Sequence, residues 1–208
     1  MPVFFQKEIS PQTRLAVWQI DEEESFFRQK VSLQASITHP HKRLQHLAGR
    51  YLLSYLFPEF PHNEILIADT RKPYLKSDAF HFSISHSSNL AAAIVSKDYR
   101  VGIDIETYTD KVLKIRDKFL NVDEFNFIEN KEDIHLITSL WSAKESVFKW
   151  WSYGGVGFSE DILFSKFRFT AKGTIDALFR KNETERHLEV QYRLFDAFCL
   201  TYVLSNGI

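Results

Sequence analysis

The chain has 208 residues, enough for one sizeable domain or two small halves. Its net charge of −1 argues against a surface built for nucleic acid, because such a surface carries a clear basic excess. A single cysteine, Cys199, excludes an internal disulfide, and no apolar run reaches the length of about 18 residues that suggests a membrane span. We therefore expect a soluble cytoplasmic protein without nucleic-acid or membrane partners, in which Cys199 is a buried, unreactive thiol.

The first predicted elements are a strand at 16–20 and a helix that starts in the acidic run 21–24. A longer amphipathic helix is predicted from Pro40 until Pro58 stops it, because apolar residues recur there at helical spacing. The other face of that helix is basic, with Lys42, Arg43, His46 and Arg50. Such a face is either simply solvated or offers cations to phosphates.

Short strands follow this helix. A strand is expected at 64–69, and the run 71–74 resembles a basic turn fixed by its proline. Alternating apolar residues at 80–84 predict a strand that ends in Ser85-His86-Ser87, and the alanine-rich run 90–96 predicts its return strand. We expect His86 to bind phosphate or cap the turn, since neighbouring residues on a strand diverge and do not form a nucleophile–base pair.

The second half opens with a strand that carries two carboxylates. Alternation over 101–106 places Gly102, Asp104 and Glu106 on one face, with the carboxylates about 7 Å apart along the strand. They either form a solvated acidic face or converge on a divalent cation such as Mg²⁺, which prefers oxygen ligands. Gly102 has no side chain, so a ligand or another backbone segment can approach that face.

The next elements are a helix at 112–119 with a basic surface, a short helix at 123–129 and a long helix at 134–151. On the long helix Trp141, Glu145 and Lys149 lie in one row, so Glu145 is either half of a surface ion pair or a third carboxylate of the acidic site. Three glycines in 154–157 read as a helix stop. A broken strand at 162–169, a polar loop at 172–186 and a hairpin of 188–194 with 198–204 complete the chain.

Three separated blocks of sequence resemble one family. They are Ile84-Ser85-His86-Ser87, Gly102-Ile103-Asp104-Ile105-Glu106, and Trp141-Ser142-x-Lys144-Glu145-Ser146 with Lys149. In order and spacing they resemble the signature of the 4′-phosphopantetheinyl transferases, in particular the longer, surfactin-synthetase-activating type. The resemblance implies an α+β fold of two similar halves, 1–100 and 101–208, related by a pseudo-twofold axis with the cofactor between them. It also implies a monomer, since one chain holds both halves.

The resemblance implies a holo-[acyl-carrier-protein] synthase type of activity. Such an enzyme transfers the 4′-phosphopantetheine arm of coenzyme A to a serine of an apo acyl or peptidyl carrier protein and releases adenosine 3′,5′-bisphosphate. Asp104, Glu106 and Glu145 would hold Mg²⁺. Glu145, directly or through a metal-bound water, would take the proton from the serine, and Lys149 would support the leaving phosphate.

The resemblance also implies a set of residues that bind coenzyme A. His86 with Arg43 or Arg50 would meet the 3′-phosphate, and Arg71 with Lys72 would meet the adenine or phosphate side. The full set expected to bind coenzyme A is Arg43, Arg50, Arg71, Lys72, Ser85, His86, Lys144 and Lys149. The chain departs from the family after Lys149, where 150–158 replaces a compact Gly-x-Gly-Leu turn.

Carrier proteins are usually acidic. The exposed residues Lys111, Lys114, Arg116 and Lys118 are therefore either a docking face or a solvated helix face.

Two other functions remain open on the residues alone. A Mg²⁺-dependent nuclease also uses an Asp-x-Glu strand and a nearby lysine, but it would bind nucleic acid in a salt-sensitive manner. A non-catalytic module that binds coenzyme A or a carrier protein would keep the basic positions. It would have no need for Asp104, Glu106 and Glu145.

Overall fold

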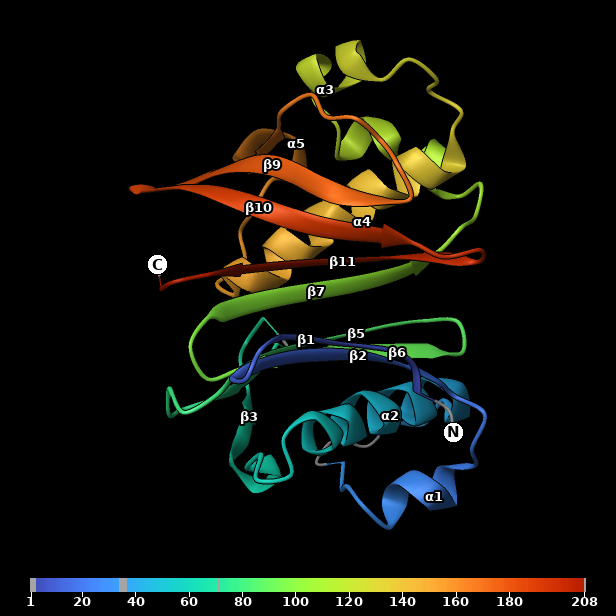
Figure 1. The fold of residues 1–208 in the computed structure, drawn as a ribbon, viewed down its shortest axis with the longest axis vertical. Helices are drawn as coiled ribbons and strands as arrows, with labels where there is room; N and C mark the ends of the chain where they lie inside the picture. The colour runs from blue at the N-terminus through green and yellow to red at the C-terminus, as the bar shows by residue number, and fades with distance from the viewer. Residues whose placement is uncertain (1–2, 34–36, 71, 208) are drawn as a thin grey trace. The chain divides into compact units, whose positions relative to one another are not determined.

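The computed structural model describes residues 3–33, 37–70 and 72–207. The chain divides into two compact units, Met1–Val101 and Gly102–Ile208. Each unit holds a mainly antiparallel sheet and helices, which confirms the predicted α+β class (Figure 1). Within the described ranges no helix is both long and apolar enough to cross a membrane.

The sheet of the first unit has four antiparallel strands in the order β1-β2-β6-β5. Their bounds are Val3–Ser10 for β1, Thr13–Gln19 for β2, His81–Ser87 for β5 and Leu90–Ser96 for β6. A separate two-stranded ribbon pairs β3, Ile65–Ile67, with β4, Pro73–Leu75. The helical elements are α1, Glu24–Arg28, α2, Pro40–Leu56, and the 3₁₀ turn η1, His62–Glu64.

Helix α2 lies along one face of this sheet, as Figure 1 shows for the cyan helix beneath the blue and green strands. Pro40 occupies its first turn, and the backbone N–H of Lys42 donates to His39 Nδ1 at 3.4 Å. Leu47, Ala48 and Leu52 are fully buried in the core of the unit. The apolar spacing that predicted this helix is therefore the face that it buries.

The second unit contains a five-stranded sheet in the order β7-β11-β10-β9-β8. The strands are β7 (Arg100–Thr107), β8 (Ile162–Phe164), β9 (Lys172–Lys181), β10 (Thr184–Leu194) and β11 (Phe198–Ser205). Helix α4, Ile134–Trp151, crosses one face of this sheet (Figure 1). The remaining elements are α3 (Val122–Phe127), α5 (Phe158–Asp161) and the 3₁₀ turns η2 (Val112–Lys114) and η3 (Arg116–Lys118).

The prediction of a polar loop at 172–186 is wrong, because this segment forms β9 and the start of β10. Ile175, Ala177 and Phe179 alternate into the core, whereas Thr174 and Asp176 are exposed. One face of β9 packs into the core and the other faces solvent. The exposed face carries polar residues, so the composition of the segment as a whole is polar although every second residue is buried. The two-residue period was the better signal.

Two smaller predictions also differ from the structure. The expected helix at 112–119 consists of two 3₁₀ turns, η2 and η3. Pro73 and Tyr74 of the expected basic turn lie in β4, where Tyr74 pairs with Leu66. Short segments of this kind gain little from local propensity, so tertiary packing decides their form.

Candidate active site

Gly102 is where β7 and α4 meet. A Cβ atom built on Gly102 would lie 2.0 Å from the carbonyl oxygen of Ser146 and 2.7 Å from the backbone nitrogen of Trp150. The space that the glycine leaves is therefore filled by the backbone of α4, one of the two readings that the sequence left open. This contact sets α4 directly over the face of β7 that carries Asp104 and Glu106.

Asp104 is held by two side chains of α4. It is only 2% exposed, and its carboxylate accepts hydrogen bonds from Ser142 Oγ at 2.8 Å and Lys149 Nζ at 2.5 Å. Ser142 Oγ also lies 3.0 Å from Thr201 Oγ1 on β11. These hydrogen bonds hold the carboxylate of Asp104 against α4 and β11.

Glu106 lies one strand repeat further along the same face. The indole N–H of Trp141 donates to its carboxylate at 3.2 Å. The alternation predicted for β7 is thus confirmed, since Gly102, Asp104 and Glu106 all face residues of α4.

Glu145 belongs to the same charged group. Burial raises the pKa of Glu145 to about 7; the negative charge of Asp104 and, less strongly, that of Glu106 add to this, whereas Lys149 lowers it. The carboxyl of Glu145 therefore gains and loses its proton near neutral pH, which is the pKa range of an efficient general base.

The donor set fits a hard cation in its chemistry. Three carboxylates from two adjoining elements influence one another electrostatically, and Mg²⁺ prefers such oxygen ligands. In the described part of the chain, however, no three His, Cys, Asp or Glu side chains gather closely enough to ligate one ion. Here Lys149 provides the positive charge beside Asp104.

Lys144 points away from this charged group. It is fully buried, and its ammonium donates to Glu124 Oε2 at 2.7 Å, the carbonyl oxygen of Phe158 at 2.9 Å and that of Ile162 at 2.8 Å. An ammonium has three N–H groups, so these contacts use all of them. These three contacts are with protein groups inside the second unit, and the coenzyme A contact expected from the place of Lys144 in the motif stays a prediction.

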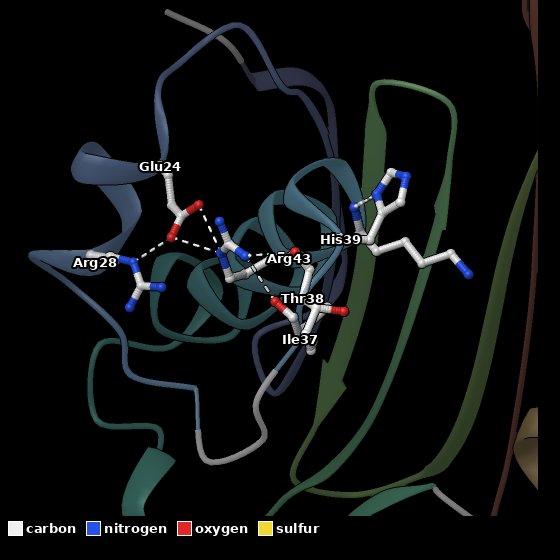
Figure 2. Close-up of polar contacts among 7 residues, drawn as sticks. Glu24, Arg28, Ile37, Thr38, His39 and Arg43 are labelled. Atoms are coloured by element: carbon white, nitrogen blue, oxygen red, sulfur yellow. Dashed lines mark hydrogen bonds and ion pairs between the residues drawn. The ribbon is translucent and has the colours of Figure 1, made fainter.

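Arg43, on α2 of the first unit, is also occupied. Figure 2 shows its guanidinium between Glu24 and the chain before α2. Its Nε lies 2.9 Å from both carboxylate oxygens of Glu24, and Nη1 donates to the carbonyl oxygens of Ile37 and Thr38 at 2.8 and 3.3 Å. Arg28 pairs with the same carboxylate. Arg43 therefore ties α2 to α1.

Arg50 and His46 lie on α2 close enough for the charge of one to affect the other. Burial lowers the pKa of Arg50, and burial together with the charges of Arg50 and Lys42 lowers that of His46. The ring of His46 lies 5.2 Å from that of His86 on β5, and the charge of Arg50 also lowers the pKa of His62, although burial is the larger cause. These shifts favour neutral histidines beside a charged Arg50, and a bound anion would raise the pKa of each histidine.

Two other expected ligands of coenzyme A, Ser85 and Lys72, belong to the first unit. Ser85 is buried on β5 opposite Ala92, on the face away from His86. Lys72 is half-buried just before β4, and its carbonyl accepts from the N–H of Ala68 at 2.9 Å. Arg71 lies outside the described residues.

Two residues of the site were not foreseen. The hydroxyl of Thr201 on β11 donates to the carbonyl oxygen of Ser142 at 2.8 Å. The same oxygen, Oγ1, lies within hydrogen-bond distance of two serine hydroxyls, Ser142 Oγ at 3.0 Å and Ser146 Oγ at 2.5 Å. Glu124 on α3 holds Lys144. The serines of α4 stand four residues apart inside an apolar pattern, which could have indicated a polar partner on the facing strand.

Cys199, on the same strand as Thr201, is buried as expected. Burial raises the pKa of its thiol to about 12, and the charge of Asp104 adds to the shift. The thiol is thus protonated at neutral pH and has no nucleophilic role.

The comparisons with known proteins agree with this geometry. Residues 100–203, half of the chain, match the 4′-phosphopantetheinyl transferase superfamily, and this match spans Asp104, Glu106, Glu145 and Lys149. The chain therefore belongs to the 4′-phosphopantetheinyl transferase superfamily, which confirms the family that the motifs indicated. It is similar to the 4′-phosphopantetheinyl transferase gsp of Aneurinibacillus migulanus, with 27% identity over 157 residues. That alignment covers 73% of this chain and 62% of the relative, less than two thirds of its length.

Proposed function

We propose that this protein transfers the 4′-phosphopantetheine arm of coenzyme A to a serine hydroxyl of an apo carrier protein and releases adenosine 3′,5′-bisphosphate. The observation that carries the proposal is the group formed by Asp104, Glu106, Glu145 and Lys149 where α4 crosses β7. Membership of the superfamily supports the same reaction. The longer, surfactin-synthetase-activating type, a holo-[acyl-carrier-protein] synthase activity and a cytoplasmic monomer belong to this proposal.

The reaction joins the serine oxygen to the phosphorus that bears the pantetheine arm. The bond from that phosphorus to the bridging oxygen breaks, and the leaving group keeps both its phosphates, one at each of the 3′ and 5′ positions. Glu145 receives the serine proton, and burial together with the charge of Asp104 raises the pKa of its carboxyl to about 7 in the metal-free site. Lys149, 2.5 Å from Asp104, provides positive charge for the leaving phosphate.

Asp104, Glu106 and Glu145 would hold Mg²⁺. When bound, the ion neutralises and orients the pyrophosphate oxygens. The side-chain partners Ser142 and Trp141 keep Asp104 and Glu106 on the α4 side of β7, so the carboxylates are oriented before any ligand arrives.

For coenzyme A itself, we assign the 3′-phosphate to Arg50 and His86 of the first unit. Arg43 is the weaker choice because Glu24 already neutralises it. His46, which was not among the expected ligands, lies beside His86 with its ring 5.2 Å away, and its lowered pKa favours the neutral ring, which can donate a hydrogen bond to a phosphate. Lys72 and Arg71 remain assigned to the adenine or phosphate side.

The test of the proposed function is the intact mass of a purified apo acyl carrier protein after incubation with this protein, coenzyme A and Mg²⁺. We expect a gain of one phosphopantetheine arm, lost when a chelator is added. A carrier whose serine is replaced by alanine is the matched control and should gain nothing. No gain with several acyl and peptidyl carriers would contradict the proposal and favour a non-catalytic binding module.

We also propose that the basic turns η2 and η3 bind the carrier protein. Lys111, Lys114 and Lys118 are exposed there, whereas Arg116 is tied to Glu132 and the carbonyl oxygen of Lys131. Changing all three lysines to glutamate should raise the KM for an acidic carrier at least about tenfold at low salt, with kcat unchanged. The difference should shrink at high salt, because exposed charges are screened.

The control for this prediction is an equal charge change elsewhere on the same unit. Lys166, Lys172 and Arg186 are exposed residues outside the basic turns, and changing them to glutamate should leave the KM for the carrier within about twofold. Equal effects of both triple variants would mean that total charge, not a docking face, governs association.

A further inference from the structure

A buried polar network surrounds Lys144. The side chains of Lys144 and Glu124 are both 0% exposed and form an ion pair of 2.7 Å. Glu124 Oε2 also accepts from the backbone N–H of Asn121 at 2.9 Å, and Oε1 accepts from that of Phe164 at 2.9 Å. With the carbonyl oxygens of Phe158 and Ile162 on Lys144, every polar atom of the pair has a partner.

The network joins three segments that are distant in sequence. Glu124 is on α3, Lys144 is in the middle of α4, and Phe158, Ile162 and Phe164 belong to α5 and β8. Four of its hydrogen bonds go to backbone groups, so it fixes the path of the chain and not only the side chains. A network that is closed off from water in this way rigidifies what it holds.

The network also reaches the carboxylates through Phe158. Lys144 holds the backbone of Phe158, whose ring lies 5.4 Å from that of Trp141 and 5.6 Å from that of Phe148. The indole N–H of Trp141 donates to Glu106. Glu145 follows Lys144 directly, one turn from Trp141 on the same row of α4.

We propose that Lys144 is a positioning residue that, together with Glu124, locks the segment 158–164 onto α4 and thereby fixes Trp141 and Glu145 for the transfer step. Its ammonium is directed into the core of the second unit and has no N–H left for a phosphate. The proposal rests on the proposed function, because it concerns the geometry of the same site. A positioning role predicts that substitution of Lys144 leaves the Kd for coenzyme A unchanged, whereas a ligand role predicts that the Kd rises.

The first experiment compares Lys144→Met with the double variant Lys144→Met/Glu124→Gln. The single change leaves a buried, uncompensated carboxylate and should lower the Tm by on the order of 10 °C. The double change removes both charges and should restore most of that loss. Lys172→Met, an exposed lysine of β9, is the matched control and should keep the wild-type Tm and rate.

The second experiment measures the double variant well below its Tm. We expect the Kd and KM for coenzyme A to stay within about threefold of wild type, while kcat falls at least about tenfold, since small displacements of a catalytic group cost that much or more. Phe158→Ala should produce a similar loss of kcat. Combined with the double variant it should add little, because the two changes break one chain of contacts.

The outcomes distinguish a positioning role of Lys144 from a ligand role and from a role in stability alone. A rise of tenfold or more in the Kd for coenzyme A in the folded double variant would overturn the positioning role in favour of a ligand role. Unchanged kcat and KM despite a lower Tm of Lys144→Met would also overturn it, because the network would then serve stability alone. A wild-type chain without any transfer activity would overturn the proposed function itself, and this result is separate from the other two.

Discussion

Glu145→Gln should lower the rate of phosphopantetheine transfer by about 10³-fold or more, because the amide cannot take the serine proton and is a poor ligand for Mg²⁺. The change is nearly isosteric and removes a charge that burial already disfavours, as the pKa of about 7 indicates. The fold should therefore persist, with a Tm equal to or slightly above that of wild type. The rate is measured in single turnover with saturating carrier protein, so that chemistry and product release are separated.

The affinity of Glu145→Gln for coenzyme A shows whether the variant has lost the chemical step or the binding of coenzyme A. Titration calorimetry in the absence of Mg²⁺ should give a Kd within a few-fold of wild type, since the proposed anion contacts lie on other residues, among them Arg50 and His86. Glu189→Gln, an exposed glutamate of β10, is the control and should be indistinguishable from wild type. If Glu145→Gln retained full activity, Glu145 would be neither base nor ligand, and the acidic group would need another role.

Gly102→Ala should destabilise the protein by about 3 kcal/mol or more. The added methyl group would lie 2.0 Å from the carbonyl oxygen of Ser146 and 2.7 Å from the nitrogen of Trp150. Both atoms belong to the backbone of α4, so no flexible side chain can move aside to make room. Val147 and Trp150 of the same helix are fully buried, so the helix is also held by its packing. Helix α4 as a whole must shift, which also displaces Ser142 and Lys149 from Asp104.

Denaturant unfolding and the transfer rate at low temperature test this second result. Gly207→Ala is the matched control, because nothing lies within 4 Å of a Cβ at that position, and its free energy of unfolding should not change measurably. A Gly102→Ala protein with wild-type stability would show that α4 does not approach β7 as closely as the structure has it. A stable but inactive Gly102→Ala protein would instead mean that the shift of α4 is cheap but disturbs the carboxylates.

The sequence by itself determined the elements that have strong periodicity. Helix α4 begins and ends where its pattern predicted, and α2 ends at Leu56, two residues before the expected stop at Pro58, because both bury a continuous apolar stripe. The alternation in β7 likewise identified which carboxylates share a face. The motifs identified the family because several separated blocks had to agree in type and order.

Only the tertiary structure decided which charged residues are already paired. Arg43 and Arg50 stand on the same basic helix and look equivalent in sequence, yet Glu24 neutralises Arg43, and Arg50 remains among histidines. Lys144 and Lys149 occupy one motif, but Lys144 meets Glu124 in the core and Lys149 meets Asp104 at the site. Local pattern fixes the face of a helix on which a residue lies, whereas its partner comes from a segment about 20 residues or more away, which only the folded chain brings near.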